Sequence, residues 1–328
     1  MARVLITGVT GQDGVLLAEQ LIARGDRVIG TTRGDPLEAR SRLSAASAAV
    51  QLRELDLREP RSIDALIADT LPEQIYHLAA PAQPNLAWKS PADATDGLCT
   101  VPARLLESML RHVPTARLVY AGSCQVFGPD SNAPQNESTP FTPRTPYGAG
   151  KAYGALLVAA FRDGRGLHAS TALLFNHESA RRQAEYVTTK ICRAAVRIAA
   201  GDRTATPLTL GATAVIRDWG HARDHMDALV RMADATTPGD YVIGTGVGRT
   251  VADFCAAAFT RVGLDWKQHV VHDPGLSRAG DVPALVADPQ RAAERLGWQA
   301  TTPFESLLDE MLDAARVALA VAPTPVAR

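Results

Sequence analysis

The sequence lacks the features that mark several broad classes of protein. Its 34 lysines and arginines nearly balance its 35 aspartates and glutamates, so the net charge is −1. Without a charge excess, no global field favours nucleic acid or an anionic membrane, and any phosphate binding must come from local sites. The 4 cysteines are scattered with no CxxC pair, which argues against a disulfide framework and against a zinc site. No apolar run approaches the length of a membrane-spanning helix.

These absences leave a soluble globular protein as the expectation. The first residues, "MARVLITGV", run directly into a strand pattern with no sign of a signal peptide. We therefore expect a cytoplasmic protein that holds no metal and binds neither nucleic acid nor membranes. Its 328 residues suffice for two domains, or for one domain with a sizeable elaboration.

The first half of the chain alternates strand patterns with helical patterns. The strand patterns are "RVLITG", "RVIGTTR", "VQLRELDL", "QIYHLAA" and "RLVYAGS", and "LHASTALLFN" adds a further one. Strands that alternate with helices predict a parallel sheet covered on both faces. The predicted fold class is therefore α/β, with a Rossmann-type doubly wound parallel sheet.

The pattern changes in the second half of the chain. A helix is predicted over 185–201, short strands at "TPLTLG" and "YVIGTG", and late helices at "PQRAAERLG" and "PFESLLDEMLDAARVALA". These elements predict a smaller C-terminal α/β lobe that binds substrate, formed by 176–328 and discontinuous in the chain. Residues 1–175 are expected to form the dinucleotide-binding domain, to which part of 225–260 returns. The Pro- and Ala-rich tail, 319–328, is expected to fray.

The stretch "TGVTGQDG" lies between a strand pattern and a helix pattern and contains three glycines. Glycines let the turn tighten and let a diphosphate reach the helix N-terminus, where free N–H groups favour an anion. The alternative is a tight turn that binds nothing, but the strand–turn–helix context favours a dinucleotide. The residues assigned to the cofactor here are Gly8, Gly11, Gln12, Asp13 and Gly14.

The second strand pattern ends in "GTTRG", with Arg33 and no carboxylate. In this position an acid usually holds the adenosine ribose, whereas an arginine can pair with a 2′-phosphate. Arg33 therefore favours NADP over NAD, and the alternative is a solvated surface arginine.

Tyr147 and Lys151 stand one helical turn apart in "YGAGK", so both side chains project from one face of a helix. A tyrosine that acts as a base at neutral pH needs its pKa lowered by about 3, worth roughly 4 kcal/mol. The ammonium of Lys151 is expected to supply part of this by favouring the phenolate. Ser123 ends the strand pattern "RLVYAGS", at the edge where a doubly wound sheet binds its ligands. We expect Ser123 to hydrogen-bond the hydroxyl or carbonyl on which Tyr147 acts.

The glycine turn, Ser123 and the Tyr147–Lys151 pair, in this order, resemble the extended short-chain dehydrogenase/reductases. Longer motifs resemble one family among them, the GDP-mannose 4,6-dehydratases. These motifs are "TGVTGQDG", "PFTPRTPYGAGKAY", "LLFNHESARRQAEYVTTKI", "IRDWGHARDHMDAL" and "LGW". The likeness runs from Arg3 to about Met311, and "FNHES" and "RDWGHA" are far more specific than the glycine turn.

The resemblance implies a set of binding residues. Cofactor contacts are implied for the glycine turn and for Asp56, Leu57, Leu78, Ala79, Ala80, Tyr147, Lys151, His177 and Arg182. Guanosine diphosphate contacts are implied for Asn176, Val187, Lys190, Arg217 and Arg278. The three cations of the second set suit a diphosphate, because arginine can grip it with two parallel hydrogen bonds. The resemblance also implies a homodimer or homotetramer that acts on a GDP-hexose with NADP, or with NAD.

The chain departs from the family at two places. "SCQ" stands where the family has a threonine, a serine and a glutamate, so Ser123 replaces the threonine and Gln125 the glutamate. In the family's scheme the sugar is oxidised at C4, and the glutamate then removes the C5 proton and helps water leave C6. Gln125 cannot shuttle that proton, and loss of a general base typically slows a reaction by about 10²- to 10⁴-fold. "LAAPA" replaces the family's "LAAQS", so Pro81 and Ala82 remove two polar groups near the sugar.

These departures set the order of the expected reactions. Ser123, Tyr147 and Lys151 can still remove a proton from a sugar hydroxyl, so isomerisation without net dehydration, by an epimerase or a pyranose–furanose mutase, comes first. GDP-mannose 4,6-dehydration comes second, and NADPH-dependent reduction of a 4-keto sugar comes third. His177 and Arg182 suggest a tightly held cofactor, which favours isomerisation over reduction. A non-catalytic GDP-sugar binder stays open, although a binder has no need of the Tyr147–Lys151 pair.

Overall fold

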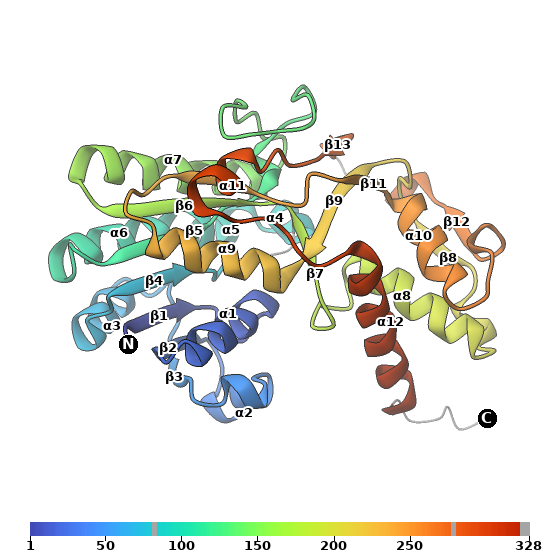
Figure 1. Ribbon diagram of the computed structural model, residues 1–328, viewed down its shortest axis with the longest axis horizontal. Helices are drawn as coiled ribbons and strands as arrows, with labels where there is room; N and C mark the ends of the chain where they lie inside the picture. The colour runs from blue at the N-terminus through green and yellow to red at the C-terminus, as the bar shows by residue number, and fades with distance from the viewer. Residues whose placement is uncertain (81–83, 277–279, 322–328) are drawn as a thin grey trace.

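The computed structural model describes residues 1–80, 84–276 and 280–321 (Figure 1). The strands of its largest sheet are β1 (Arg3–Thr7), β2 (Arg27–Thr32), β3 (Gln51–Glu54), β4 (Gln74–His77), β5 (Arg117–Ala121), β6 (His168–Leu174) and β10 (Asp240–Ile243). All pair in parallel, in the order β10-β6-β5-β4-β1-β2-β3. This order, which reverses direction at β1, is that of a doubly wound sheet, so the predicted fold class is confirmed.

Helices cover both faces of this sheet (Figure 1). On one face pack α1 (Gln12–Ala23) and α9 (Ala222–Asp234). On the other pack α3 (Ser62–Thr70), α6 (Val101–His112) and α7 (Pro146–Arg165). Each face therefore encloses its own hydrophobic core.

The residues of β1 show how the main sheet supports a hydrophobic core on each of its two faces. Val4 and Ile6 belong to the core beneath α1 and α9, while Leu5 belongs to the core beneath α3 and α6. All three side chains are fully buried, and burying each one contributes about 1.5–3 kcal/mol. Successive side chains leave opposite faces of a strand, so a sheet covered on both sides requires the uninterrupted apolar run found here.

A second group of elements follows the main sheet. Its strands are β7 (Asn176–Glu178), β8 (Leu208–Leu210), β9 (Ile216–His221), β11 (Gly248–Thr250), β12 (Val270–His272) and β13 (Ala284–Leu285). β9 pairs with β7, β11 and β13, and β12 pairs with β8. The helices of this group are α8 (Val187–Ala199), α10 (Val251–Thr260) and α12 (Phe304–Val321), which gather at one end of the molecule in Figure 1. Trp219, Phe254 and Leu308 are fully buried in the core that they share.

Short helices complete the described chain. They are α2 (Pro36–Ser41), η1 (Ala45–Ser47), α4 (Pro84–Lys89), α5 (Pro91–Thr95), η2 (Asp96–Thr100), η3 (Cys124–Val126), η4 (Arg203–Ala205), η5 (Trp266–Gln268), η6 (Pro274–Leu276) and α11 (Gln290–Leu296). Among the described residues, no helix is both long and apolar enough to cross a membrane.

The second half of the chain differs in detail from the sequence expectation. The helix predicted over 185–201 begins only at Val187, because Tyr186 holds extended backbone dihedrals and caps the helix. Helices α9 and α10 were not predicted, although Met226, Leu229 and Met232 mark the buried stripe of α9 in the sequence. β10 belongs to the main sheet, so both halves of the chain build it. The division into 1–175 and 176–328 stays a prediction.

Candidate active site

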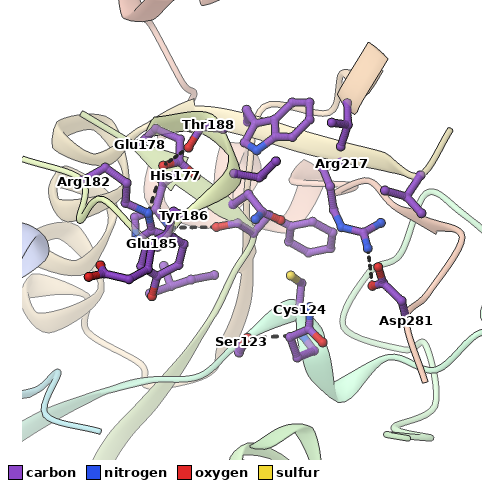
Figure 2. Close-up of a pocket in the computed structure, with 18 of the residues that line it drawn as sticks. Ser123, Cys124, His177, Glu178, Arg182, Glu185, Tyr186, Thr188, Arg217 and Asp281 are labelled. Carbon is purple, nitrogen blue, oxygen red and sulfur yellow. Dashed lines mark hydrogen bonds and ion pairs between the residues drawn. The ribbon is translucent and has the colours of Figure 1, made fainter. Parts of the chain in front are cut away.

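A cavity of about 470 Å³ opens at the carboxyl ends of the main-sheet strands (Figure 2). Ala121 at the end of β5, Ser123 just after it, Leu174 at the end of β6 and Asn176 at the start of β7 line one wall. Residues of α8, β8 and β9 line the opposite wall. Ligands of doubly wound proteins bind at this edge of the sheet, so the cavity is the candidate active site.

The start of α7 brings Tyr147 to this cavity. Thr145 caps the helix by accepting a hydrogen bond of 3.0 Å from the Gly148 N–H, and Pro146 is the first helical residue, a position proline favours. A Cβ at Gly148 would overlap the carbonyl oxygen of Gln125. Only glycine therefore lets the helix approach Gln125 so closely, and this approach keeps Tyr147 and Gln125 in one cavity.

Ser123 and Lys151 flank Tyr147. Ser123 accepts a hydrogen bond of 3.2 Å from the Gln125 N–H. Burial raises the pKa of Tyr147 well above its usual range, and a hydrogen bond with Ser123 works in the opposite direction. Lys151 is 4% exposed and donates a hydrogen bond of 2.6 Å from Nζ to the carbonyl oxygen of Ala121. Its burial lowers the pKa of the ammonium to about 8. The predicted lowering of the Tyr147 pKa by Lys151 is not seen in this structure: burial raises that pKa, and the groups that oppose the rise are Ser123 and Arg182.

The glycine turn has the shape that a dinucleotide diphosphate requires. Gly8 adopts a φ of +76°, and a Cβ on Gly14 would lie 2.5 Å from the Gly8 carbonyl oxygen. α1 begins after Gly11, and within the described parts of the chain no side chain caps its N-terminus. The first N–H groups of a helix have no partner within the helix, so this end of α1 is left to receive an anion.

Side-chain hydrogen bonds and an ion pair connect the first turn of α1 to β7. Asp13 Oδ2 lies 3.1 Å from His177 Nε2, and Gln12 Nε2 donates to the His177 carbonyl oxygen at 3.2 Å. Burial opposes ionisation of Asp13, but the charge and hydrogen bond of His177 lower its pKa well below the usual range. Burial likewise opposes protonation of His177, yet Asp13 raises its pKa above 6.5. His225 stacks on His177 with 4.8 Å between ring centres.

β7 and the segment that follows it contribute further charged side chains to the cavity. Arg182 Nε forms an ion pair of 2.9 Å with Glu178 Oε2, which also accepts a hydrogen bond of 3.0 Å from Thr188. The Arg182 guanidinium lies 3.5 Å from the centre of the Tyr186 ring. Figure 2 shows Glu178, Arg182, Tyr186 and Glu185 together on one side of the pocket.

Arg217 lies on the other side, paired with Asp281 (Figure 2). Arg217 is 7% exposed and also donates to the Val282 carbonyl oxygen at 2.8 Å. Val187 and Lys190, from the first turn of α8, line the same cavity, and Lys190 is exposed. Asn176 lines it too, and its side-chain oxygen is buried without a partner among the described residues.

The remaining predicted residues follow β2, β3 and β4, or lie outside the described residues. Arg33 is exposed after β2, and Asp56 is paired with Arg58 at 2.6 Å. Hydrogen bonds from Arg58, with a smaller contribution from the charge of Arg33, lower the pKa of Asp56 to about 2. Leu57 is buried beside it. Leu78, Ala79 and Ala80 follow β4, and Leu78 and Ala80 also line the cavity. Pro81, Ala82 and Arg278 lie outside the described residues.

Sequence reasoning missed many of the residues that line the cavity, and four of them carry titratable side chains that matter to its chemistry: Glu178, Glu185, Tyr186 and Asp281. The first three stand in or beside "FNHES" and the residues that precede α8, so their position next to predicted contacts was an available signal. Asp281 offered no such signal, because its pairing with Arg217 joins distant parts of the chain. Within the described residues, no group of histidine, cysteine, aspartate and glutamate side chains could hold a metal.

Comparison with known proteins gives a consistent result. The sequence pattern of the family "GDP-mannose 4,6 dehydratase" matches residues 5–311. GDP-mannose 4,6 dehydratase 2 of Arabidopsis thaliana is 36% identical over 321 residues, which cover 94% of this chain and 85% of that protein. UDP-glucose 4-epimerase of Thermotoga maritima, solved with UDP-glucose, superimposes with a TM-score of 0.86 at 22% identity, over 97% of this chain and 99% of that one. RMD from Pseudomonas aeruginosa, solved with NADPH, gives a TM-score of 0.81 at 20% identity, over 97% and 100%.

The two similar structures support the fold, whereas the sequence relatives provide evidence about the reaction. Isomerisation without net dehydration was expected first, and this prediction is wrong: the family pattern and the Arabidopsis relative, which span nearly the whole chain, both carry the name of a dehydratase. The expectation gave the change at Gln125 more weight than the likeness of the rest of the chain. Dehydration, placed second, is the better supported reaction. The chain belongs to the GDP-mannose 4,6-dehydratase family of extended short-chain dehydrogenase/reductases.

Proposed function

We propose that the protein is a GDP-mannose 4,6-dehydratase, which removes water from the sugar and leaves a 4-keto-6-deoxy product. The observation that carries the proposal is the family match over residues 5–311. It is supported by a cavity in which Ser123 and Tyr147 face cations suited to a diphosphate. Dehydration needs oxidation at C4, removal of the C5 proton, departure of the C6 hydroxyl and reduction at C6.

A nicotinamide dinucleotide fits the glycine turn. A Cβ on Gly14 would overlap the Gly8 carbonyl oxygen, so glycine is needed where α1 begins against the turn, and no side chain among the described residues caps this helix. Gly8, Gly11 and Gly14 would hold the diphosphate and Asp56 the adenosine end, with Arg33 favouring NADP. When bound, such a cofactor would supply a hydride acceptor for C4 of the sugar and a hydride donor for C6.

Tyr147 removes the proton from O4 while C4 is oxidised. Its phenol is held at neutral pH in the protonated form by burial, so the base must be generated as the substrate binds. Ser123 positions O4 by a hydrogen bond. Lys151, with a pKa of about 8, keeps an ammonium one turn away, and this charge favours the phenolate when the proton leaves.

The diphosphate binds on the side of α8 and β9. Lys190 is exposed at this wall and needs no rearrangement to meet an anion. Arg217 already pairs with Asp281, so Asp281 offsets part of its charge and holds its guanidinium in place. Asn176 supplies a buried oxygen to which no described residue donates, and a ligand N–H or O–H would satisfy it.

The proposal is tested by product analysis with a panel of GDP-hexoses and mass spectrometry. We expect GDP-mannose to lose one water and Tyr147→Phe to slow this loss by about 10²- to 10⁴-fold, while calorimetry shows that GDP still binds to the variant. Calorimetry should also show GDP binding more tightly than UDP. A product of unchanged mass from GDP-mannose would overturn the proposal.

A further inference from the structure

One catalytic role in the dehydration has no residue assigned to it. A group must take the proton from C5 of the 4-keto sugar and supply a proton to the departing C6 hydroxyl. Gln125, the pocket residue after Ser123 and Cys124, is an amide and accepts no proton at neutral pH. Burial raises the pKa of the Cys124 thiol to about 12, so this neighbour is not a thiolate either. A carboxylate from elsewhere in the cavity could take the place of the family's glutamate in this role.

Among the described residues, the carboxylates that line the cavity are Asp13, Glu178, Glu185 and Asp281. Three of them have structural partners. Asp13 pairs with His177, Glu178 with Arg182 and Thr188, and Asp281 with Arg217. Each of these carboxylates would have to break a charge-assisted contact before it could accept a proton, and each such contact favours the ionised form.

Glu185 differs from these three. Its carboxylate forms no hydrogen bond or ion pair with any described residue, and the side chain is exposed at the cavity. Its backbone is nevertheless held: the next residue, Tyr186, stacks on the Arg182 guanidinium at 3.5 Å. The Tyr186 carbonyl oxygen also accepts a hydrogen bond of 2.9 Å from the Lys190 N–H in the first turn of α8. Figure 2 shows Glu185 beside Tyr186, across the pocket from the Arg217–Asp281 pair.

We propose that Glu185 is the general base and acid of the elimination, in place of a carboxylate at position 125. This inference rests on the proposed function. The Glu185 carboxylate takes the proton from C5, and the electron pair of the C5–H bond forms the C5–C6 double bond. The C6–O bond breaks, and the proton held by Glu185 leaves with the hydroxyl as water. Glu185 returns to its carboxylate form, so the step is balanced without any other reactant.

The test compares Glu185→Gln with the wild-type enzyme in two assays. In the first, ketone formation from GDP-mannose is expected to fall by about 10²- to 10⁴-fold in kcat, with little change in GDP affinity by calorimetry. Glu305→Gln, which removes an exposed glutamate at the start of α12, is the matched control and should keep the wild-type rate. Adding Gln125→Glu to Glu185→Gln should restore part of the activity, since a carboxylate then returns to the cavity.

The second assay requires no turnover of the cofactor. The preformed GDP-linked 4-keto-6-deoxy sugar is incubated with each enzyme in D₂O, and proton NMR follows exchange of the C5 hydrogen. Wild-type enzyme should exchange it, and Glu185→Gln should slow the exchange by at least about tenfold. An unchanged exchange rate in Glu185→Gln, or its absence in the wild-type enzyme, would overturn the role of Glu185. If the wild-type enzyme forms no ketone from GDP-mannose but exchanges C5 through Glu185, the proposed function fails, and Glu185 remains a base that acts at C5 of a GDP-linked sugar.

Discussion

Replacing Lys151 by methionine is predicted to change the pH dependence of stability and to lower the activity, two effects with different physical causes. The Lys151 side chain is 4% exposed, and burial lowers its pKa from 10.5 to about 8. Each pKa unit is worth about 1.4 kcal/mol, so holding the buried ammonium costs the native state about 3 kcal/mol at neutral pH. Methionine fills a similar volume without the charge, but it leaves the carbonyl oxygen of Ala121 without the hydrogen bond from Nζ.

The sign of the pH dependence follows from the lowered pKa. Below pH 8 both native and unfolded chains carry the ammonium, so the full cost is present. Between pH 8 and 10.5 the native state releases its proton while the unfolded state keeps it, so stability rises with pH. From pH 7 to 9.5 the wild-type free energy of unfolding should therefore gain about 2 kcal/mol relative to Lys151→Met.

Urea unfolding of both proteins at pH 7 and 9.5 measures this difference. Taking the difference between the two proteins cancels the titration of groups that they share. Ketone formation by Lys151→Met should be at least about 100-fold slower than wild type, because the charge that favours the Tyr147 phenolate is gone. A pH dependence that is the same in both proteins, within about 0.5 kcal/mol, would refute the reasoning.

Three further predictions test other parts of the site. Tyr147→Phe should lower kcat for ketone formation by about 10²- to 10⁴-fold, and a smaller effect in steady-state kinetics would remove Tyr147 from the O4 proton step. Gly14→Ala places a Cβ 2.5 Å from the Gly8 carbonyl oxygen, so it should weaken NADP binding, measured by calorimetry, or lower Tm. The control is Gly34→Ala, whose Cβ would meet no described atom within 4 Å and should change neither value. Asp281→Asn should raise KM for the GDP-sugar more than it lowers kcat, because Arg217 loses its ion pair; unchanged KM would show that Asp281 does not hold Arg217 for the diphosphate.

The parts of the molecule that local patterns encode were predictable from the sequence. The alternation of strands and helices gave the doubly wound fold, and the spacing of Tyr147 and Lys151 placed both on one helix. The glycine turn was equally local, since Gly8 and Gly14 act within one strand–turn–helix unit. Such features depend on periodicities of a few residues.

The parts that depend on contacts between distant residues were not predictable. The pairing of Asp281 with Arg217 and of Asp13 with His177 arises from the tertiary fold. The pKa of Tyr147 also depends on burial by the whole cavity, which the spacing to Lys151 does not reveal. The ranking of reactions was wrong because it rested on Gln125 alone. A single position in the sequence does not show which other carboxylates share its cavity.

Proton NMR of the product formed from GDP-mannose in D₂O tests the central claim most directly. The account predicts a 6-deoxy sugar with a methyl group at C6, a ketone at C4 and one solvent deuterium at C5. A GDP-hexose that keeps its C6 hydroxyl and differs from mannose only in configuration or ring size would contradict it.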